Sequence, residues 1–452
     1  MARNFGLGRR AFLKNAGIMA VASAASAEHT LASLAAEPSD GSYDFDKPLD
    51  RFGTDSIKYD RQIRVFGKGS IQVGMGVADM DFRTAPPITK ALRERMQHEN
   101  WGYLDMPSSF SESIVSWNKR RYGVEIDPRS LVITTGVDAG LVAALKAFAP
   151  PGSKVLLNTP TYDGFYHDLE FTGTLPEENP LKVVDGRYSL DFEDFERRIS
   201  QETKAFILCN PHNPTGNCWS PADLTRLGEI CLRHRVVVFA DEIHCDFVTK
   251  GNKYTPFASL ANKAVVNNSI TFKSASKSFN LASLRCAYLY SDNADYAARV
   301  QANSPTDALS TMGMIATRAA YTAGEAWLDQ CVAYIDANHD YVQQFVRKNI
   351  PLCRVVKPQG TYLVWVDVDR VAGRIGADRL AAEANKKQAP SLKPLTPEQM
   401  VERYFVKKAK VHMVAGSWCG HTGISHMRMN IATARRTLEL ALNNIANALR
   451  SA

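Results

Sequence analysis

From about residue 130 onward, short runs of apolar and often β-branched residues alternate with longer segments of helical periodicity. Such runs are typical of strands that are apolar on both faces and therefore buried in a parallel sheet. We expect strands over residues 155–157, 205–209, 236–240, 270–272 and 287–290. The helical periodicity predicts helices over about 138–148, 221–234 and 312–321. Their alternation predicts an α/β fold in which helices flank a mostly parallel sheet.

The two ends of the chain are less regular than this central part. We expect a large domain over residues 101–325 and a smaller α+β domain that combines residues 41–100 with 326–452. A strand is predicted at 364–366 within the smaller domain. Residues 373–397 hold two adjacent lysines and three prolines, a composition that predicts a solvated insertion.

Composition excludes several classes of protein. The 452 residues are 45% hydrophobic and 22% charged, which is ordinary for a globular chain and excludes collagen-like, coiled-coil and wholly disordered structures. The formal net charge is +7, but the first 27 residues contribute four positive charges and no negative one. The rest of the chain therefore carries only +3, too little and too dispersed to indicate a nucleic-acid partner.

The first 40 residues predict an export signal and a flexible leader. Arg9 and Arg10 precede a mildly apolar run that ends in small residues, and this pattern resembles a twin-arginine signal. We expect cleavage after Ala27, or after Ala36 as a second choice, and a periplasmic or otherwise exported protein that meets the twin-arginine translocase. An amphipathic first helix with a chance arginine pair is the alternative. The run is too short and too polar for stable membrane insertion.

Cysteine spacing predicts neither a metal site nor a disulfide framework. The eight cysteines include no CxxC pair and no cluster at metal-ligand spacing. Cys209 and Cys231 lie among apolar residues, which is typical of buried thiols. A single bridge stays open, since an exported protein meets an oxidising compartment.

A lysine lies where a parallel sheet collects ligands. The segment Ser274–Asn280 follows the predicted strand at 270–272 and places Lys277 between hydroxyl-bearing residues. Ligands of open α/β sheets bind at the carboxyl ends of the strands, so Lys277 is positioned for a phosphate or a carbonyl group. A solvated loop lysine is the alternative for this segment taken alone.

Two further strands end in polar residues. Asp241 leaves the buried run 236–240 at its carboxyl end, where a carboxylate is costly unless it meets a cation such as a pyridinium nitrogen. Residues 210–216 (NPHNPTG) follow the run 205–209, and their two prolines restrict the backbone so that Asn213 is held rigidly. A turn without function is the alternative for the latter.

These three segments, in this order, resemble the pyridoxal 5′-phosphate (PLP) enzymes of the aspartate-aminotransferase fold, fold type I of the aminotransferase class I/II superfamily. The resemblance covers residues from about 45 to 450. It is nearest to the cystathionine β-lyase, or carbon–sulfur β-lyase, branch. That branch is indicated by residues 78–82 (ADMDF), 101–103 (WGY), 162–166 (YDGFY), 241–247 (DEIHCDF) and 255–260 (TPFASL).

The resemblance implies roles for residues that hold the cofactor ring. Lys277 would bind PLP covalently and later move the α-proton, and Asp241 would keep the ring nitrogen protonated, so that the ring becomes an electron sink. Asn213 would donate a hydrogen bond to the ring hydroxyl, His244 would point toward the same oxygen, and Tyr162 would stack on the ring face.

The resemblance also implies how the phosphate and the substrate are bound. Phosphate would be held by the backbone N–H groups of Val137 and Asp138 at a helix start, by Ser274, Ser276 and Arg285, and by Tyr103 of the neighbouring subunit, which requires a homodimer. Arg428 would bind the carboxylate of an amino-acid substrate bidentately; a surface helix-start arginine is the alternative. For Lys154 and His212 we expect surface and turn roles.

The activity implied is β-elimination from cystathionine or another cysteine conjugate, giving pyruvate, ammonia and a thiol. An aminotransferase that moves the amino group of an L-amino acid to a 2-oxo acid shares the early steps and remains an alternative. Residues 418–426 depart from the pattern of the lyase branch, so the side chain of the substrate stays open. A non-catalytic binding protein is a remote alternative. The dinucleotide fingerprint GxGxxG of dehydrogenases follows no early strand.

Overall fold

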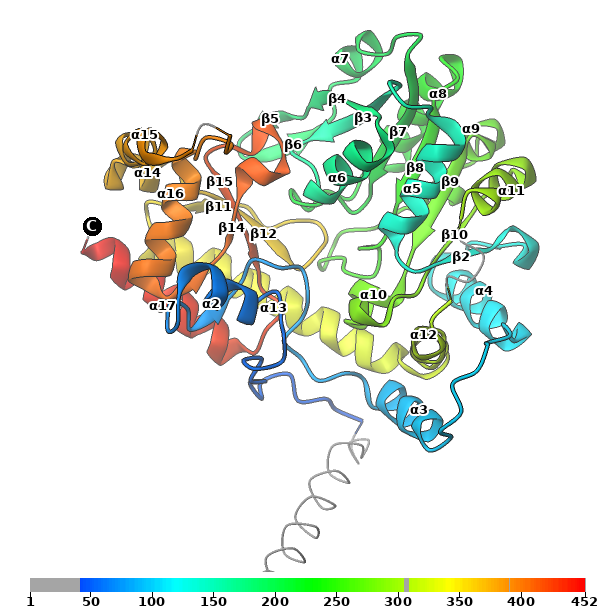
Figure 1. The fold of residues 1–452 in the computed structure, drawn as a ribbon, viewed down its shortest axis with the longest axis horizontal. Coiled ribbons are helices and arrows are strands. Elements are labelled where there is room, and N and C mark those ends of the chain that lie inside the picture. Colours follow the sequence, from blue (N-terminus) through cyan, green and yellow to red (C-terminus); the bar gives the residue numbers. More distant parts are fainter. Residues whose placement is uncertain (1–40, 305–308, 390, 452) are drawn as a thin grey trace, which may run out of the picture.

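The computed structural model describes residues 41–304, 309–389 and 391–451. The predicted export signal and leader, residues 1–40, lie outside the described residues. The described residues form a seven-stranded and a four-stranded sheet with helices packed on them, and two small two-stranded sheets (Figure 1). No helix within the described ranges combines the length and apolar character that a membrane span requires.

The larger sheet has seven strands in the order β2-β10-β9-β8-β7-β3-β4. Five neighbours from β9 to β4 run parallel, and β10 pairs antiparallel with both β9 and β2. The mostly parallel sheet predicted from the sequence is thus confirmed. Its strands are β2 (Val132–Thr134), β3 (Lys154–Thr159), β4 (Leu175–Pro180), β7 (Thr203–Cys209), β8 (Val237–Asp241), β9 (Ser269–Lys273) and β10 (Ala287–Tyr290).

Helices cover both faces of this sheet, because the central strands are apolar on both sides. One face packs against α5 (Val137–Phe148), α6 (Asp163–Thr172) and α11 (Ala294–Ala302). The other packs against α7 (Phe192–Arg197), α8 (Pro221–Arg233) and α9 (Lys263–Asn267). The local sequence sets the start of α8, where Ser220 and Asp223 form a capping box and Pro221 occupies the first turn.

The smaller sheet is antiparallel and has the order β11-β12-β15-β14. Its strands are β11 (Arg354–Val355), β12 (Leu363–Asp367), β14 (Val414–Ala415) and β15 (His426–Asn430). The strand predicted at 364–366 lies in β12. Nearby, β1 (Val73–Gly74) pairs in parallel with β13 (Val411–His412), so the early part of the chain joins the late part.

Helices join the two regions. The 25-residue helix α13 (Glu325–Asn349) extends from the large-sheet side to the small sheet, and its two halves contribute to different apolar cores. Beside its start, α3 (Pro86–Met96) and α4 (Ser108–Tyr122) pack against α12 (Thr311–Ala323). The small sheet is packed by α17 (Arg435–Arg450) and α16 (Pro397–Tyr404), with α2 (Asp60–Phe66) nearby. The domain boundaries at 100 and 325 stay predictions.

The expectation of a solvated insertion over residues 373–397 is corrected in part. Helices α14 (Asp369–Ile375) and α15 (Ala377–Lys387) fill its first half, and α15 packs against α16. Ala377 and Ala381 are buried, while Lys386 and Lys387 are exposed. Two alanines one helical turn apart form a face too narrow to stand out among charged neighbours, which is why composition favoured an insertion.

Candidate active site

The carboxyl ends of three adjacent strands bring the polar segments together. In the large sheet Cys209 of β7 is paired with Asp241 of β8, and Asp241 is paired with Phe272 of β9. Asn213 follows the end of β7 by four residues, and Lys277 follows the end of β9 by four. The sheet register therefore places the three predicted segments at one edge, as the sequence indicated.

Lys277 lies in the single-turn helix α10 (Ala275–Ser278) directly after β9. Ser274 caps this turn by accepting a hydrogen bond from the Ser276 backbone N–H. The half-buried Lys277 side chain donates from Nζ to the Ala78 carbonyl oxygen at 3.0 Å. Burial and the nearby Arg428 guanidinium lower the pKa of the amine, which favours the neutral form that accepts a proton.

Asp241 is a buried acid without a cation. Its Oδ1 accepts one hydrogen bond, from the Ile243 backbone N–H at 3.1 Å, and no residue within the described ranges forms an ion pair with it. Burial raises the pKa of this carboxyl to about 7. A buried carboxylate is stable only when a positive group compensates it, so the position calls for a cationic ligand.

The loop that carries Asn213 is held against the small-sheet side. Gly216 has a φ of +73°, and a Cβ at this position would lie 2.2 Å from the Cβ of Pro358, so only glycine fits the turn. The buried His212 imidazole is hydrogen-bonded to the Thr215 hydroxyl at 2.9 Å, which is the turn role expected for it. Asn213 itself is buried and lines the cavity.

Arg428 reaches this loop from β15 in the small sheet. It is 5% exposed, and its Nη1 donates to Asn213 Oδ1 while its Nη2 donates to the Gly76 carbonyl oxygen, both at 3.2 Å. Its Nε is buried and has no hydrogen-bond partner. A buried guanidinium edge without an acceptor is costly, and a ligand carboxylate is the acceptor that matches its geometry.

Two rings border the same space. His244 is buried, and burial together with Lys277 and Arg428 lowers its pKa well below the usual value, so the imidazole is neutral; its Nδ1 has no partner. Tyr162 stands at the start of α6. A Cβ on Gly164 would lie 2.3 Å from the Tyr162 ring, so the missing side chain lets this ring fold over the helix start.

The other end of the site suits an anion. Helix α5 starts at Val137 after Gly136, and no side chain caps its first turn, so free N–H groups and the helix dipole favour negative charge there. Ser276 and Arg285 line the same cavity. The Ser274 hydroxyl instead contacts the Cys286 carbonyl and the Ser276 hydroxyl, at 2.7 Å each.

One cavity unites most of the predicted residues. Nine of them line it: Val137, Asp138, Tyr162, Asn213, Asp241, His244, Ser276, Lys277 and Arg285. Ser274 and Arg428 lie in the layer around it, and the fully exposed Tyr103 does not line it. The prediction did not assign Ala78 or Cys209, which also line the cavity. Ala78 lies in the ADMDF motif, but it acts through its backbone, which no side-chain pattern reveals.

The polar groups around the cavity that lack a partner are together complementary to PLP. An acid without a cation, an uncapped helix start, a neutral imidazole nitrogen and a lysine amine are complementary to a pyridinium ring that carries a phosphate, a hydroxyl and an aldehyde. The described residues hold no group of three or more His, Cys, Asp or Glu side chains that could bind a metal ion. Fold and cavity thus define a PLP-dependent enzyme of the aspartate-aminotransferase type.

Comparison with known proteins agrees with this class. The profile of the aminotransferase class I and II family matches residues 70–445, and the chain belongs to that family. Cystathionine β-lyase PatB of Bacillus subtilis (strain 168) is 36% identical over 90% of this chain and 99% of its own length.

Solved structures show the same fold with the cofactor bound. Cystalysin of Treponema denticola, which contains PLP, superposes with a TM-score of 0.81 at 26% identity, over 91% of this chain and 99% of that one. A PLP-bound carbon–sulfur lyase of Staphylococcus hominis, complexed with the inhibitor L-cycloserine, gives a TM-score of 0.78 at 30% identity over 90% and 98%. PLP is accordingly the cofactor of this family member.

Proposed function

We propose that this protein is a carbon–sulfur β-lyase that cleaves L-cysteine thioethers such as cystathionine. The observation that carries the proposal is the 36% identity to a cystathionine β-lyase along nearly the whole of both chains. The two solved relatives named above support it, since one is called a carbon–sulfur lyase and the other cystalysin.

Different residues of the chain bind the substrate, hold the ring proton and remove the α-proton. PLP, when bound, supplies an electron sink that stabilises the carbanion formed at the substrate α-carbon. Arg428 binds the substrate carboxylate through its free guanidinium edge. Asp241 holds a proton on the ring nitrogen, and its buried site strengthens that ion pair. Lys277, whose pKa is lowered, removes the α-proton at Nζ.

In the proposed reaction, β-elimination is followed by hydrolysis of the product. The C–H bond at the α-carbon and the C–S bond at the β-carbon break, a carbon–carbon double bond forms, and the sulfur leaves with the electron pair and takes up a proton. Addition of one water to the released enamine, after it tautomerises to an imine, gives pyruvate and ammonia. No oxidant or second substrate is needed.

The direct test is incubation of the purified holoenzyme with cystathionine, with and without an added 2-oxo acid. We expect pyruvate, ammonia and free thiol in equal amounts without the acceptor. Product formation that depends strictly on the acceptor would identify an aminotransferase instead. That alternative is supported by the family profile, which takes its description from aminotransferases.

The active site is proposed to form between two subunits of a homodimer. Tyr103 is fully exposed on the single chain and Trp101 beside it is 53% exposed, although both are large aromatic residues. A partner cavity that receives Tyr103 would bury it. Mixing Tyr103→Ala and Lys277→Ala protomers, each inactive alone, should restore part of the activity through hybrid dimers; no restoration would oppose a shared site.

Export through the twin-arginine route is proposed for residues 1–40. Its support is the Arg9-Arg10 pair ahead of an apolar run with small residues at its end. We expect Arg9→Lys with Arg10→Lys to retain the protein in the cytoplasm of a producing bacterium, whereas the control Lys14→Arg is exported. Fractionation and detection of the shortened chain measure this. Equal export of both variants would remove the proposal.

A further inference from the structure

One segment without regular secondary structure contacts both the Lys277 amine and the Arg428 guanidinium. In this segment, residues 76–81 and called the strap below, the carbonyl oxygen of Gly76 accepts from Arg428 Nη2 at 3.2 Å. Two residues further, the Ala78 carbonyl oxygen accepts from Lys277 Nζ at 3.0 Å and from the Tyr362 hydroxyl at 2.8 Å. The amine and the guanidinium that the proposed reaction needs are thus held by alternate carbonyls of one piece of backbone.

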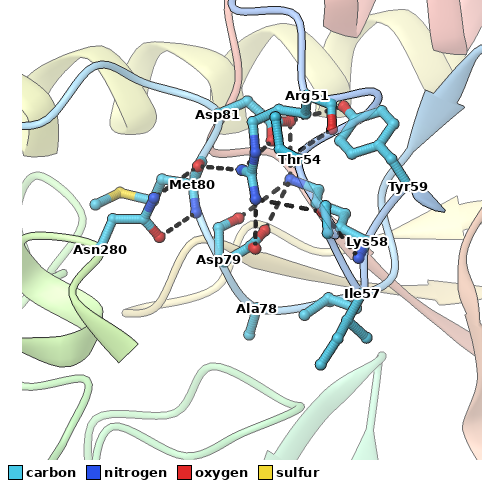
Figure 2. Close-up of polar contacts among 12 residues, drawn as sticks. Arg51, Thr54, Ile57, Lys58, Tyr59, Ala78, Asp79, Met80, Asp81 and Asn280 are labelled. Carbon is cyan, nitrogen blue, oxygen red and sulfur yellow. Dashed lines mark hydrogen bonds and ion pairs between the residues drawn. The ribbon is translucent and has the colours of Figure 1, made fainter. Parts of the chain in front are cut away.

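The segments that carry Lys277 and Arg428 also hold the strap. Asn430, two residues after Arg428, donates to the carbonyl oxygens of Val77 at 2.7 Å and Asp79 at 2.5 Å. Asn280, three residues after Lys277, accepts from the Met80 N–H at 2.8 Å and donates to the Met80 carbonyl oxygen at 2.9 Å (Figure 2). The strap is therefore a bridge between the large-sheet and the small-sheet halves of the site.

Two cationic side chains, Arg51 and Lys58, fix the strap from its other side (Figure 2). Arg51 pairs with Asp79 and with Asp81, at 3.0 Å each, and also donates to the Met80 carbonyl oxygen at 2.9 Å. Lys58 pairs with Asp81 at 2.8 Å and lies 3.6 Å from Asp79. Two cations thus face two carboxylates, and both carboxylates belong to the strap.

Stability alone does not explain this cluster. Lys58 is fully buried and Asp81 is 2% exposed, and the cost of removing such charges from water offsets most of their attraction. Apolar residues would fill the same volume at least as favourably. What the charges add is direction: the planar guanidinium of Arg51 and the Lys58 ammonium hold Asp79 and Asp81 in defined positions, which apolar packing does not.

We propose that Arg51 and Lys58 are positioning residues, which act through the strap to set the Lys277 amine and the Arg428 guanidinium together. The inference rests on the proposed function, because it assumes that these two groups react with and bind the substrate. Displacement of the strap shifts both groups at once. A change at Arg51 should therefore impair substrate binding and proton transfer together, although Arg51 touches neither group.

The test compares Arg51→Met with the matched control Lys357→Met in the holoenzyme. Lys357 also bridges two carboxylates, Asp336 at 2.9 Å and Asp340 at 2.7 Å, and its side chain is 23% exposed against 16% for Arg51. For Arg51→Met we expect kcat to fall by on the order of 10- to 100-fold and KM to rise several-fold, since misplacement of about 1 Å has such effects. Lys357→Met should change neither kcat nor KM by more than about twofold.

A second readout does not depend on turnover. Strap amides are hydrogen-bonded in the folded chain, Met80 N–H to Asn280 and Asp81 N–H to the Ala432 carbonyl oxygen at 2.9 Å. Hydrogen exchange of residues 76–81 should accelerate in Arg51→Met and stay unchanged in Lys357→Met, in the presence and absence of PLP. If wild type fails to cleave thioethers, the proposed function fails, while this measurement still decides whether Arg51 orders the strap.

Two milder variants keep the test decisive if Arg51→Met does not fold. Arg51→Lys retains the charge but cannot reach both carboxylates with a planar fork. Asn280→Gly tolerates the positive φ of this position, +59°, and removes both contacts to Met80. Both should raise KM, lower kcat and accelerate exchange of the strap. The proposal would be overturned if folded variants with accelerated hydrogen exchange in the strap kept the kcat and KM of wild type. It would also be overturned if hydrogen exchange of the strap did not change.

Discussion

Two neighbouring groups of buried polar and charged side chains differ in how they are partnered. Around the strap, Arg51 and Lys58 are paired with Asp79 and Asp81. In the adjoining cavity, Asp241 has no paired cation, and His244 and Arg428 each have a buried nitrogen without a hydrogen-bond partner. Because an unpaired buried polar group is costly, we interpret the unpartnered groups of the cavity as ligand contacts and the ion pairs around the strap as contacts that hold the backbone.

The strongest test of this division is Lys277→Ala. We expect kcat to fall by about 10⁴-fold or more, because both the covalent bond to PLP and the base for the α-proton are lost. Borohydride treatment of the holoenzyme, followed by mass analysis, should trap PLP on wild type and not on the variant. A variant that retains turnover, or a wild type on which no cofactor is trapped, would oppose the assignment. A pure binding protein would keep its ligand affinity.

Asp241→Asn separates ligand binding from stability. In the holoenzyme we expect kcat to fall by about 10²-fold or more, since the proposed partner of the ring nitrogen would lose its charge and with it electrostatic stabilisation of the carbanion. Steady-state kinetics with a cysteine thioether measure this. Asn keeps the shape of the side chain, so Asp241→Glu, which keeps the charge, is the matched comparison and should lose less.

Without PLP the same variant should be more stable than wild type. Burial raises the pKa of Asp241 to about 7, above the unfolded value of about 3.9. The folded chain therefore holds this proton more tightly, so its contribution to stability falls as pH rises from about 4 to 7. We expect apo Asp241→Asn to exceed apo wild type by up to about 4 kcal/mol at pH 8 and by little at pH 4. If the unfolding temperatures of apo wild type and apo Asp241→Asn depend on pH in the same way, the Asp241 carboxyl is not a buried acid without a compensating cation.

Arg428→Lys tests the free guanidinium edge. Lysine keeps the charge but cannot bind a carboxylate through two parallel hydrogen bonds. We expect KM for the amino acid to rise by roughly 10- to 100-fold, corresponding to a loss of about 1.5–3 kcal/mol for a charged hydrogen bond, with a smaller fall in kcat. Titration of the holoenzyme with an unreactive amino acid, followed by absorbance, measures binding directly. If Arg428→Lys lowered kcat without raising KM, Arg428 would not bind the substrate carboxylate.

Much of this arrangement could be predicted from sequence. The run 236–240 is uniformly apolar, so Asp241 was expected at its carboxyl end, and Asp241 is the last residue of β8. Asn213 and Lys277 follow neighbouring strands in the same manner, and parallel pairing makes those ends meet. The resemblance to a family then supplied His244, Tyr162 and Arg428, whose positions depend on contacts between distant parts of the chain.

Other features could not be predicted from the sequence, because they depend on backbone atoms or on contacts between distant parts of the chain. The Ala78 carbonyl that accepts from Lys277 is a property of the chain path, and any residue could supply it. The pairing of Lys58 with Asp81 links two charges that, in sequence, look like ordinary solvated residues. Likewise, the antiparallel orientation of β10 between two strands leaves no mark on its apolar pattern.

Tyr162 tests the smallest effect, because it belongs to neither group. Its ring lies over the start of α6, edge-on to Phe165 at 5.3 Å, and its hydroxyl forms no hydrogen bond with a described residue. Burial raises the pKa of this hydroxyl, so it stays protonated throughout the working pH range. If the ring alone matters, Tyr162→Phe should leave kcat and KM within about threefold, whereas Tyr162→Ala should lower PLP affinity by up to roughly tenfold, the value of one aromatic contact. A large loss in Tyr162→Phe would instead assign the hydroxyl a direct part in proton transfer, which steady-state kinetics across pH would reveal.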